Sequence, residues 1–265
     1  MTAIAATARQ SDSLGAFAAF VQLEARRAIR NRRYVMFAVA FPVVFYLLYT
    51  GVLSGTADPN ATIGGLQWRT YFMVSMATYA AMGAALGGAI VIAQDRASGW
   101  TRQLRVTPLP ATAYIAGKLV VSYIVTVPAI AAVFVAGLLV SHVELSAGTW
   151  LATFTILVIG SLPFAALGLL IGYFFDTSSA QGAMTITYFS LAILGGLWAP
   201  VSSFPETLAT IGRMLPSFRL ADLGRDVAAG ASLDPASVAI LAAYAVAIGG
   251  LAAWRYRTSE QRAHG

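Results

Sequence analysis

Cysteine is absent from this chain of 265 residues, and histidine occurs only at positions 142 and 264. The first absence excludes disulfide bonds, thiolate metal sites and cysteine nucleophiles. We expect His142 at a membrane surface and His264 in the C-terminal tail, so the two do not predict a histidine-based metal site. Charge is scarce too, because only 11% of the residues are Asp, Glu, Lys or Arg, against about 25% in an average soluble domain. The composition therefore excludes an ordinary soluble domain.

Apolar residues dominate instead, with 58% hydrophobic residues and a mean hydropathy of +0.72. A helix that rises about 1.5 Å per residue needs about 20 apolar residues to cross a hydrocarbon core about 30 Å thick. We predict an all-α polytopic membrane protein with six transmembrane helices. The predicted spans are about residues 34–53, 71–93, 119–140, 150–175, 182–198 and 236–254.

The first 33 residues are predicted to form a cytoplasmic segment, since residues 1–13 do not have the pattern of a cleavable signal peptide. Within residues 14–33, Leu14, Phe17 and Val21 begin an apolar row at helical spacing, while arginines fall largely on the other side. This pattern favours an amphipathic helix at the membrane surface, with its arginines toward lipid headgroups. A plain basic flank that fixes the topology is the alternative.

Three polar segments complete the predicted division of the chain: a cytosolic loop at 94–118, an outer segment at 200–235 and a cytoplasmic tail at 255–265. The outer segment is charged and too interrupted to span a bilayer, so we predict a re-entrant or interfacial helical hairpin. It is interrupted by Pro200, Pro205 and Pro216. With the N-terminus inside, thirteen of the seventeen Lys and Arg residues lie in inner segments. The positive-inside rule then places both termini in the cytoplasm.

The predicted spans lack a source of energy of their own. None of them contains Asp, Glu, Lys, Arg or His, the groups through which ion-coupled transporters usually move charge. The chain also lacks the glycine-rich loop that holds ATP phosphates. A membrane enzyme would need convergent catalytic groups, whereas Asp95, Asp176 and the pair Asp222 and Asp226 are scattered. A pump driven by a separate partner therefore remains, and nucleic-acid binding is not expected because the basic residues flank apolar runs.

Two stretches give the chain a resemblance to a known family. The first runs from Asp95 through Gly99 and Leu104 to Thr107-Pro108 and continues to Gly117-Lys118; the second begins at Gly195-Gly196 and contains Pro200, Phe204-Pro205, Leu215-Pro216 and Leu223 to Gly230. In this order, together with the six predicted spans, they resemble the permease subunits of ABC-2 type ATP-binding-cassette exporters.

The resemblance implies two permease copies, as a homodimer or a heterodimer, bound to two copies of a cytosolic ATPase that carries the ATP and Mg²⁺. This chain would bind no cofactor, and it would lie in the plasma membrane of a bacterium. The loop after the second span would contain the coupling helix, where Asp95 and Arg96 pair across a polar interface with the ATPase. The candidate coupling residues are Asp95, Arg96, Gly99, Trp100, Arg102, Leu104, Arg105 and Pro108. Lys118 is predicted to be an anchor at the head of the third span.

The same resemblance puts the first, second and fifth spans at the axis of the dimer. The candidate lining residues on these spans are Phe45, Tyr49, Met76, Tyr79 and Phe189, since aromatic and Met side chains suit a pliable apolar ligand. Contacts with lipid or between helices are an equal explanation for each residue alone. A path without charge predicts a hydrophobic or amphipathic substrate, such as a drug, an antibiotic or a lipid-like molecule. The alternatives are export or flipping of a lipid-linked glycan, and a lipid-modifying membrane enzyme.

Overall fold

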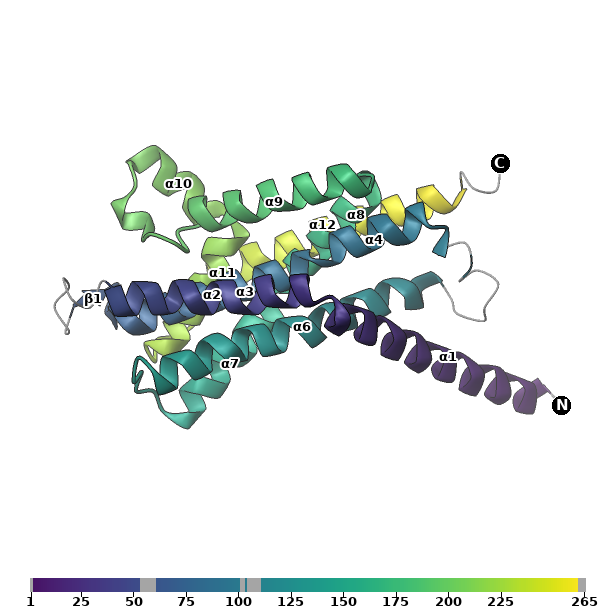
Figure 1. Ribbon diagram of the computed structural model, residues 1–265, viewed down its shortest axis with the longest axis horizontal. Helices are drawn as coiled ribbons and strands as arrows, with labels where there is room; N and C mark the ends of the chain where they lie inside the picture. Colours follow the sequence, from purple (N-terminus) through teal and green to yellow (C-terminus); the bar gives the residue numbers. More distant parts are fainter. Residues whose placement is uncertain (1, 53–60, 101–102, 104–110, 262–265) are drawn as a thin grey trace.

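The computed structural model describes residues 2–52, 61–100, 103 and 111–261. Most helices run along the long axis of one bundle, while α1 leaves it obliquely (Figure 1). The elements are α1 (Thr2–Arg30), α2 (Arg32–Val52), β1 (Thr62–Ile63), β2 (Leu66–Gln67), α3 (Trp68–Leu86), α4 (Gly88–Ala97), α6 (Ala111–Leu139), α7 (Ala147–Gly160), α8 (Leu162–Phe174), α9 (Thr177–Leu194), the 3₁₀ turn η2 (Val201–Ser203), α10 (Glu206–Met214), α11 (Pro216–Ala228) and α12 (Pro235–Gln261).

The two ends of the bundle differ in what they carry. We call the end that holds α1, the last turn of α4, the first turn of α6 and the last turns of α12 the termini end (Figure 1). The opposite end carries β1, β2 and α10, and we call it the hairpin end (Figure 1). α1 and the end of α12 thus lie at the same end of the bundle, and the side of the membrane that this end faces stays a prediction.

Five helical segments are long and apolar enough to cross a membrane, which confirms a polytopic membrane protein. They are Tyr34–Gly51, Trp68–Ala97, Ala113–Leu139, Ala147–Phe174 and Pro235–Arg255. The predicted fifth span, 182–198, is not among them. Its helix, α9, begins at Thr177 and ends at Leu194, and it opens on the polar residues Thr177, Ser178 and Ser179, followed by Gln181. These residues lower its hydropathy, so its place in the membrane stays a proposal.

The expectation of an all-helical chain needs one correction, which is the hairpin of β1 and β2 after α2. Thr62 pairs with Gln67 and Ile63 with Leu66 in antiparallel register. The two linking residues, Gly64 and Gly65, have φ angles of 60° and 82°. Such positive values suit the tight turn that joins two right-twisted strands, and glycine adopts them without strain.

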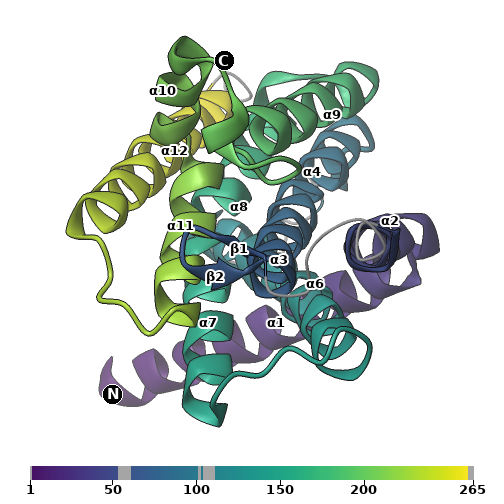
Figure 2. The same cartoon turned by 90° about the vertical axis from the view of Figure 1, so that its left-hand side faces the viewer.

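The centre of the bundle is α3, which Figure 2 shows end-on among the other helices. In its most apolar stretch 83% of the residues are buried, against 22% for the span of α2 and 17% for that of α12. Small residues allow this close packing, because helices in lipid associate through shape rather than through hydrophobicity. A Cβ on Gly87, between α3 and α4, would lie 1.9 Å from the Tyr34 ring, so a larger residue there would force this ring to move.

The predicted outer hairpin is helical, and each of its prolines stands at the start of a helical segment. Pro200 precedes η2, Pro205 precedes α10 and Pro216 is the first residue of α11. Proline is favoured at such positions because its fixed φ angle suits a first turn and its missing N–H would be unpaired anyway. α11 packs on α3, α7 and α12, and Leu220 in it is fully buried. The second arm of the hairpin therefore enters the bundle.

Candidate functional site

A cluster of buried charges joins three helices at the termini end. α1 contributes Glu24 and Arg27, α4 contributes Asp95, and α6 contributes Lys118 and Tyr114. Lys118 Nζ donates to Glu24 Oε2 and, at 2.6 Å, to Asp95 Oδ2. Glu24 and Asp95 are each 2% exposed, and Lys118 is 7% exposed. We call Glu24, Arg27, Asp95, Tyr114 and Lys118 the ion cluster.

The other two members complete the hydrogen bonding of the carboxylates. Arg27 Nη1 lies 2.8 Å from Glu24 Oε1 and 3.4 Å from Asp95 Oδ1, and Tyr114 Oη donates to Asp95 Oδ2 at 3.2 Å. Burial alone would lower the pKa of Arg27, but its hydrogen bond and Coulombic attraction to Glu24, with those to Asp95, raise that pKa above its usual value. Two carboxylates thus face two cations, which balances the charge.

This balance fixes the geometry of the three helices. A buried charge without a partner is strongly unfavourable, so each of these side chains needs the others in place. Lys118 contacts one carboxylate on α1 and one on α4, and therefore holds the two helices to α6. Arg27, whose side chain is 48% exposed, is the member that solvent reaches. A displacement of one helix alone would leave an unpaired charge inside the protein.

The ion cluster changes the interpretation of Asp95 and Lys118. The sequence places both in a loop between two spans, whereas the structure continues α4 to Ala97 and begins α6 at Ala111. Asp95 is turned into the protein and bonds to Arg27, Tyr114 and Lys118, and its pairing with an ATPase residue stays a prediction. Lys118 is more than an anchor, since it bridges two other helices.

Arg96 also binds within the chain. Its Nη1 donates to the backbone carbonyls of Gly172, Tyr173 and Phe175, at 2.9, 2.8 and 3.3 Å. These carbonyls lie at the C-terminal end of α8, where the last turn of a helix leaves its acceptors free and favours a cation. Arg96 therefore ties the end of α4 to the junction between α8 and α9.

The remaining coupling candidates follow α4 directly. Gly99 has a φ angle of 72°, the left-handed conformation that commonly ends a helix. The guanidinium of Arg27 lies 5.3 Å from the centre of the Trp100 ring, which links α1 to the start of the connecting segment. Arg102, Leu104, Arg105 and Pro108 lie outside the described residues. The contact of this segment with an ATPase stays a prediction.

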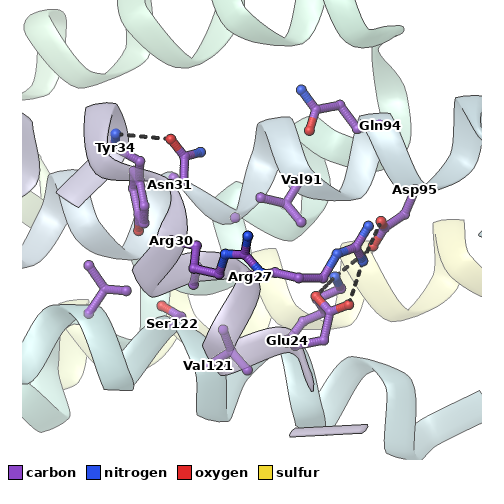
Figure 3. Close-up of a pocket in the computed structure, with 15 residues that line it drawn as sticks. Glu24, Arg27, Arg30, Asn31, Tyr34, Val91, Gln94, Asp95, Val121 and Ser122 are labelled. Atoms are coloured by element: carbon purple, nitrogen blue, oxygen red, sulfur yellow. Dashed lines mark hydrogen bonds and ion pairs between the residues drawn. The ribbon is translucent and has the colours of Figure 1, made fainter. Parts of the chain in front are cut away.

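A cavity of about 420 Å³ adjoins the ion cluster (Figure 3). α1, α2, the junction of α3 and α4, and α6 all contribute to its lining. Its lining residues are Glu24, Arg27, Ala28, Arg30, Asn31, Tyr34, Gly87, Gly88, Val91, Gln94, Asp95, Lys118, Val121, Ser122 and Val125. Figure 3 shows Arg27 extending along the cavity toward Glu24 and Asp95.

A second cluster, of aromatic rings, lies where α2, α3 and α9 meet the chain before η2. Phe45 lies 5.3 Å and Tyr79 lies 5.8 Å from Trp198, centre to centre, and Phe189 lies 5.7 Å from it. The Tyr49 hydroxyl donates to the Trp198 carbonyl at 2.8 Å. The aromatic cluster consists of Phe41, Phe45, Tyr49, Phe72, Tyr79, Tyr188, Phe189 and Trp198.

The aromatic cluster brings together four of the five predicted lining residues. Phe45, Tyr49, Tyr79 and Phe189 all belong to it, while Met76 packs in the core of α3. Met76 and Tyr79 are both 0% exposed, so in this conformation they pack within the subunit. Their role as lining of a substrate path stays a prediction.

Sequence reasoning missed Glu24 and Trp198. Glu24 follows Phe20 by four residues, and both are buried, so the acidic residue lies on the apolar side of α1 rather than on its arginine side. A lone carboxylate on an apolar helix face is the signal that could have found it. Trp198 ends the glycine-rich stretch after α9, and no pattern in the sequence pairs it with residues of α2 and α3.

The sequence model of the family described as ABC-2 family transporter protein matches residues 58–254. The putative transport permease YvfS of Bacillus subtilis (strain 168) is 29% identical over 222 residues, which cover 83% of this chain and 89% of that protein. The family match begins before β1 and ends within α12. It therefore includes Asp95, Lys118 and most of the aromatic cluster, but not α1.

Proposed function

Because the chain belongs to the ABC-2 family of transporter permeases, we propose that it exports a hydrophobic or amphipathic molecule across a bacterial plasma membrane. The chain is a permease subunit without an ATPase domain, and ABC-2 permeases pair with ABC ATPase subunits. Two permease copies and two ATPase copies would form the working assembly. ATP and Mg²⁺ would be bound by the ATPase, and the termini end would face the cytosol.

The observation that carries this proposal is the double contact of Lys118 with Glu24 and Asp95. The connection from α4 to α6 is the natural place for an ATPase to push, because α4 ends and α6 begins at the termini end. A force on this connection acts on α4 and α6 together, and Lys118 transmits the force to α1. The three helices then move as one unit, since separating them would expose an unpaired buried charge.

Movement of this unit would reach the aromatic cluster by two routes. One route is the continuous path from α4 through Gly87 into α3, which carries Tyr79. The other is the contact of Arg96 with the end of α8, next to the start of α9. α3 and α9 would shift against α2, and the ring contacts among Phe45, Tyr79 and Trp198 would change. Ring contacts are individually weak and adaptable, so they can be exchanged for contacts with a substrate.

The proposed substrate class follows from the chemistry of the aromatic cluster. It contains neither a carboxylate nor a cation among its eight members, and it offers ring faces with a few hydroxyl and indole groups. Such a surface favours an apolar or amphipathic molecule over a polyanion. The free-energy cost of removing water from a polyanion would not be offset there, because the cluster has no cation to pair with it. A drug, an antibiotic or a lipid-like molecule fits this description.

Transport into inverted vesicles tests the substrate class. The permease and its ATPase would be reconstituted together, and ATP-dependent uptake of an apolar fluorescent dye would be measured. Phe45→Ala should lower uptake by about tenfold, the effect expected from loss of about 1.4 kcal/mol of binding. The matched control is Phe37→Ala on the same helix, because Phe37 is 65% exposed. Equal uptake by the two variants would remove the aromatic cluster from the substrate path.

Orientation can be tested separately because the chain has no cysteine. Gln103→Cys at the termini end and Ser202→Cys at the hairpin end place single thiols at exposed positions. A maleimide that cannot cross membranes should label Ser202→Cys in intact cells and label Gln103→Cys only after lysis. The reverse pattern would invert the proposed topology.

A further inference from the structure

The cavity next to the ion cluster has a gradient of polarity that three of its walls share. On α4 the lining changes from Asp95 and Gln94 to Val91 and then Gly88; on α6 it changes from Lys118 to Ser122 and Val125. Both sequences run from the termini end toward the middle of a candidate span. The third wall does the same, with Arg27 and Arg30 before Tyr34. The cavity is therefore polar at the membrane surface and apolar toward the bilayer interior.

Charge at the mouth of the cavity is not balanced. Glu24 and Asp95 are occupied by Lys118 and Arg27. Arg30 lines the cavity and is exposed, and no acidic side chain within the described part of the chain forms an ion pair with it. The lining thus carries three cations against two carboxylates. The unbalanced cation is followed in the chain by Asn31, which also lines the cavity and whose side-chain oxygen accepts from the Tyr34 N–H.

We propose that this cavity binds an anionic phospholipid from the adjacent leaflet, with its phosphate at Arg30 and Asn31 and one acyl chain along Val91, Val121 and Val125. A membrane lipid has the same order of polarity as the cavity, headgroup at the surface and chain inward. Arginine is well suited to phosphate because its planar donors match two oxygens at once. A volume of about 420 Å³ falls within the range of about 300–1,000 Å³ for ligand pockets, and it accommodates a headgroup with the first part of a chain.

Such a lipid would contact four helices at once. It would lie against α1, α2, α4 and α6 beside the ion cluster, and so it would stabilise the arrangement that Lys118 holds. The site is distinct from the aromatic cluster, and the inference does not depend on which molecule the permease transports. Failure of the uptake experiments above would leave it intact.

Lipid titration of the full chain, purified in detergent with its ATPase, tests the proposal. Native mass spectrometry would report the fraction of complexes that retain added phosphatidylglycerol. Arg30→Gln should weaken the apparent affinity about fivefold, as expected for one cation at a membrane surface. Arg26→Gln is the matched control, since Arg26 is an exposed arginine of the same helix outside the cavity. Equal loss in both variants would show general attraction to basic residues and overturn the site.

A second pair of variants tests the chain-binding part without changing charge. Ser122→Phe fills the cavity from α6, whereas Val120→Phe adds the same bulk at a position that is 42% exposed on that helix. Only Ser122→Phe should reduce lipid retention. The melting temperatures of both variants would be measured to show that each is folded.

Two other ligands distinguish the sources of phosphate. Glycerol phosphate has the headgroup without the chains and should fail to displace the lipid, and phosphatidylcholine should bind more weakly than phosphatidylglycerol. Displacement by glycerol phosphate at equal concentration would assign the site to a soluble phosphate. Equal affinity for phosphatidylglycerol and phosphatidylcholine would overturn the proposed preference for an anionic headgroup.

Discussion

The ion cluster and the aromatic cluster join helices by different physical means. The ion cluster joins α1, α4 and α6 through directional contacts between buried charges, of which Lys118 to Asp95 at 2.6 Å is one. The aromatic cluster joins α2, α3 and α9 through ring contacts between helices with centroid distances of 4.4 to 5.9 Å. A buried charge that loses its partner is strongly penalised, whereas a ring that slides keeps much of its contact. The first region is suited to hold a geometry and the second to change one.

This difference assigns the two regions to two tasks. A transporter driven by a separate ATPase needs a stiff part that accepts force and a pliable part that opens. The ion cluster lies at the termini end, where α4 ends and α6 begins. The aromatic cluster lies between α2 and α9, whose outward faces are partly exposed. Variants of the two regions should therefore differ in kind as well as in size.

The largest expected effect comes from Lys118→Met. This change leaves Glu24 and Asp95 buried with Arg27 as their remaining cation, and breaking a buried ion pair in this way costs about 3–5 kcal/mol. The melting temperature of the purified protein, followed by tryptophan fluorescence, should fall strongly.

The neutral combination Glu24→Gln, Asp95→Asn and Lys118→Met should recover most of this loss, because it removes all three buried charges together. Arg26→Met controls for the loss of a cation from the exposed face of α1. If Lys118→Met melted like that control, the ion cluster would not hold the helices.

Gly87→Ala comes next and tests the path between the two regions. The new methyl group would lie 1.9 Å from Cε2 of Tyr34, and overpacking of this kind costs about 1–3 kcal/mol. Gly88→Ala is the matched control, since no atom lies within 4 Å of its added Cβ. Urea or thermal unfolding should separate the neighbours, and equal stability would contradict the close packing of α2 on this junction.

The sequence predicted those helices that can be recognised from a single apolar run or from one amphipathic face. The charged, proline-interrupted segment 200–235 was predicted to be helical, and the structure places η2, α10 and α11 in it. The rest depended on contacts between distant residues. The pairing of Glu24 with Lys118 spans 94 positions, and α4 extends past the apolar run because its charges are satisfied inside the protein. A hydropathy pattern cannot contain that information.

Phe45→Leu should have a smaller effect on stability than either change above. Phe45 is partly buried and stacks on Phe41 at 4.4 Å, and a swap between apolar side chains of similar size costs less than about 1.5 kcal/mol. Dye uptake should nevertheless change, since the ring face is lost. A melting temperature lowered as far as by Lys118→Met would remove the contrast between the two regions.

The smallest effect should come from Tyr49→Phe. It removes one hydrogen bond, from the Tyr49 hydroxyl to the Trp198 carbonyl at 2.8 Å, and keeps the ring that stacks on Phe72. The expected cost is about 1 kcal/mol. Tyr188→Phe, which loses the bond to the Tyr79 carbonyl, should behave alike, and a loss of several times this size would show that hydrogen bonds rather than ring contacts hold the aromatic cluster.

The most direct test of the central claim is transport per ATP hydrolysed by the neutral combination Glu24→Gln, Asp95→Asn and Lys118→Met, reconstituted with the ATPase. If the ion cluster passes force from the connecting segment to α1, this folded variant should transport about tenfold less dye per ATP than Arg26→Met, within the usual range of coupling energies. An unchanged ratio would show that the ion cluster serves stability alone, and it would contradict the proposed coupling.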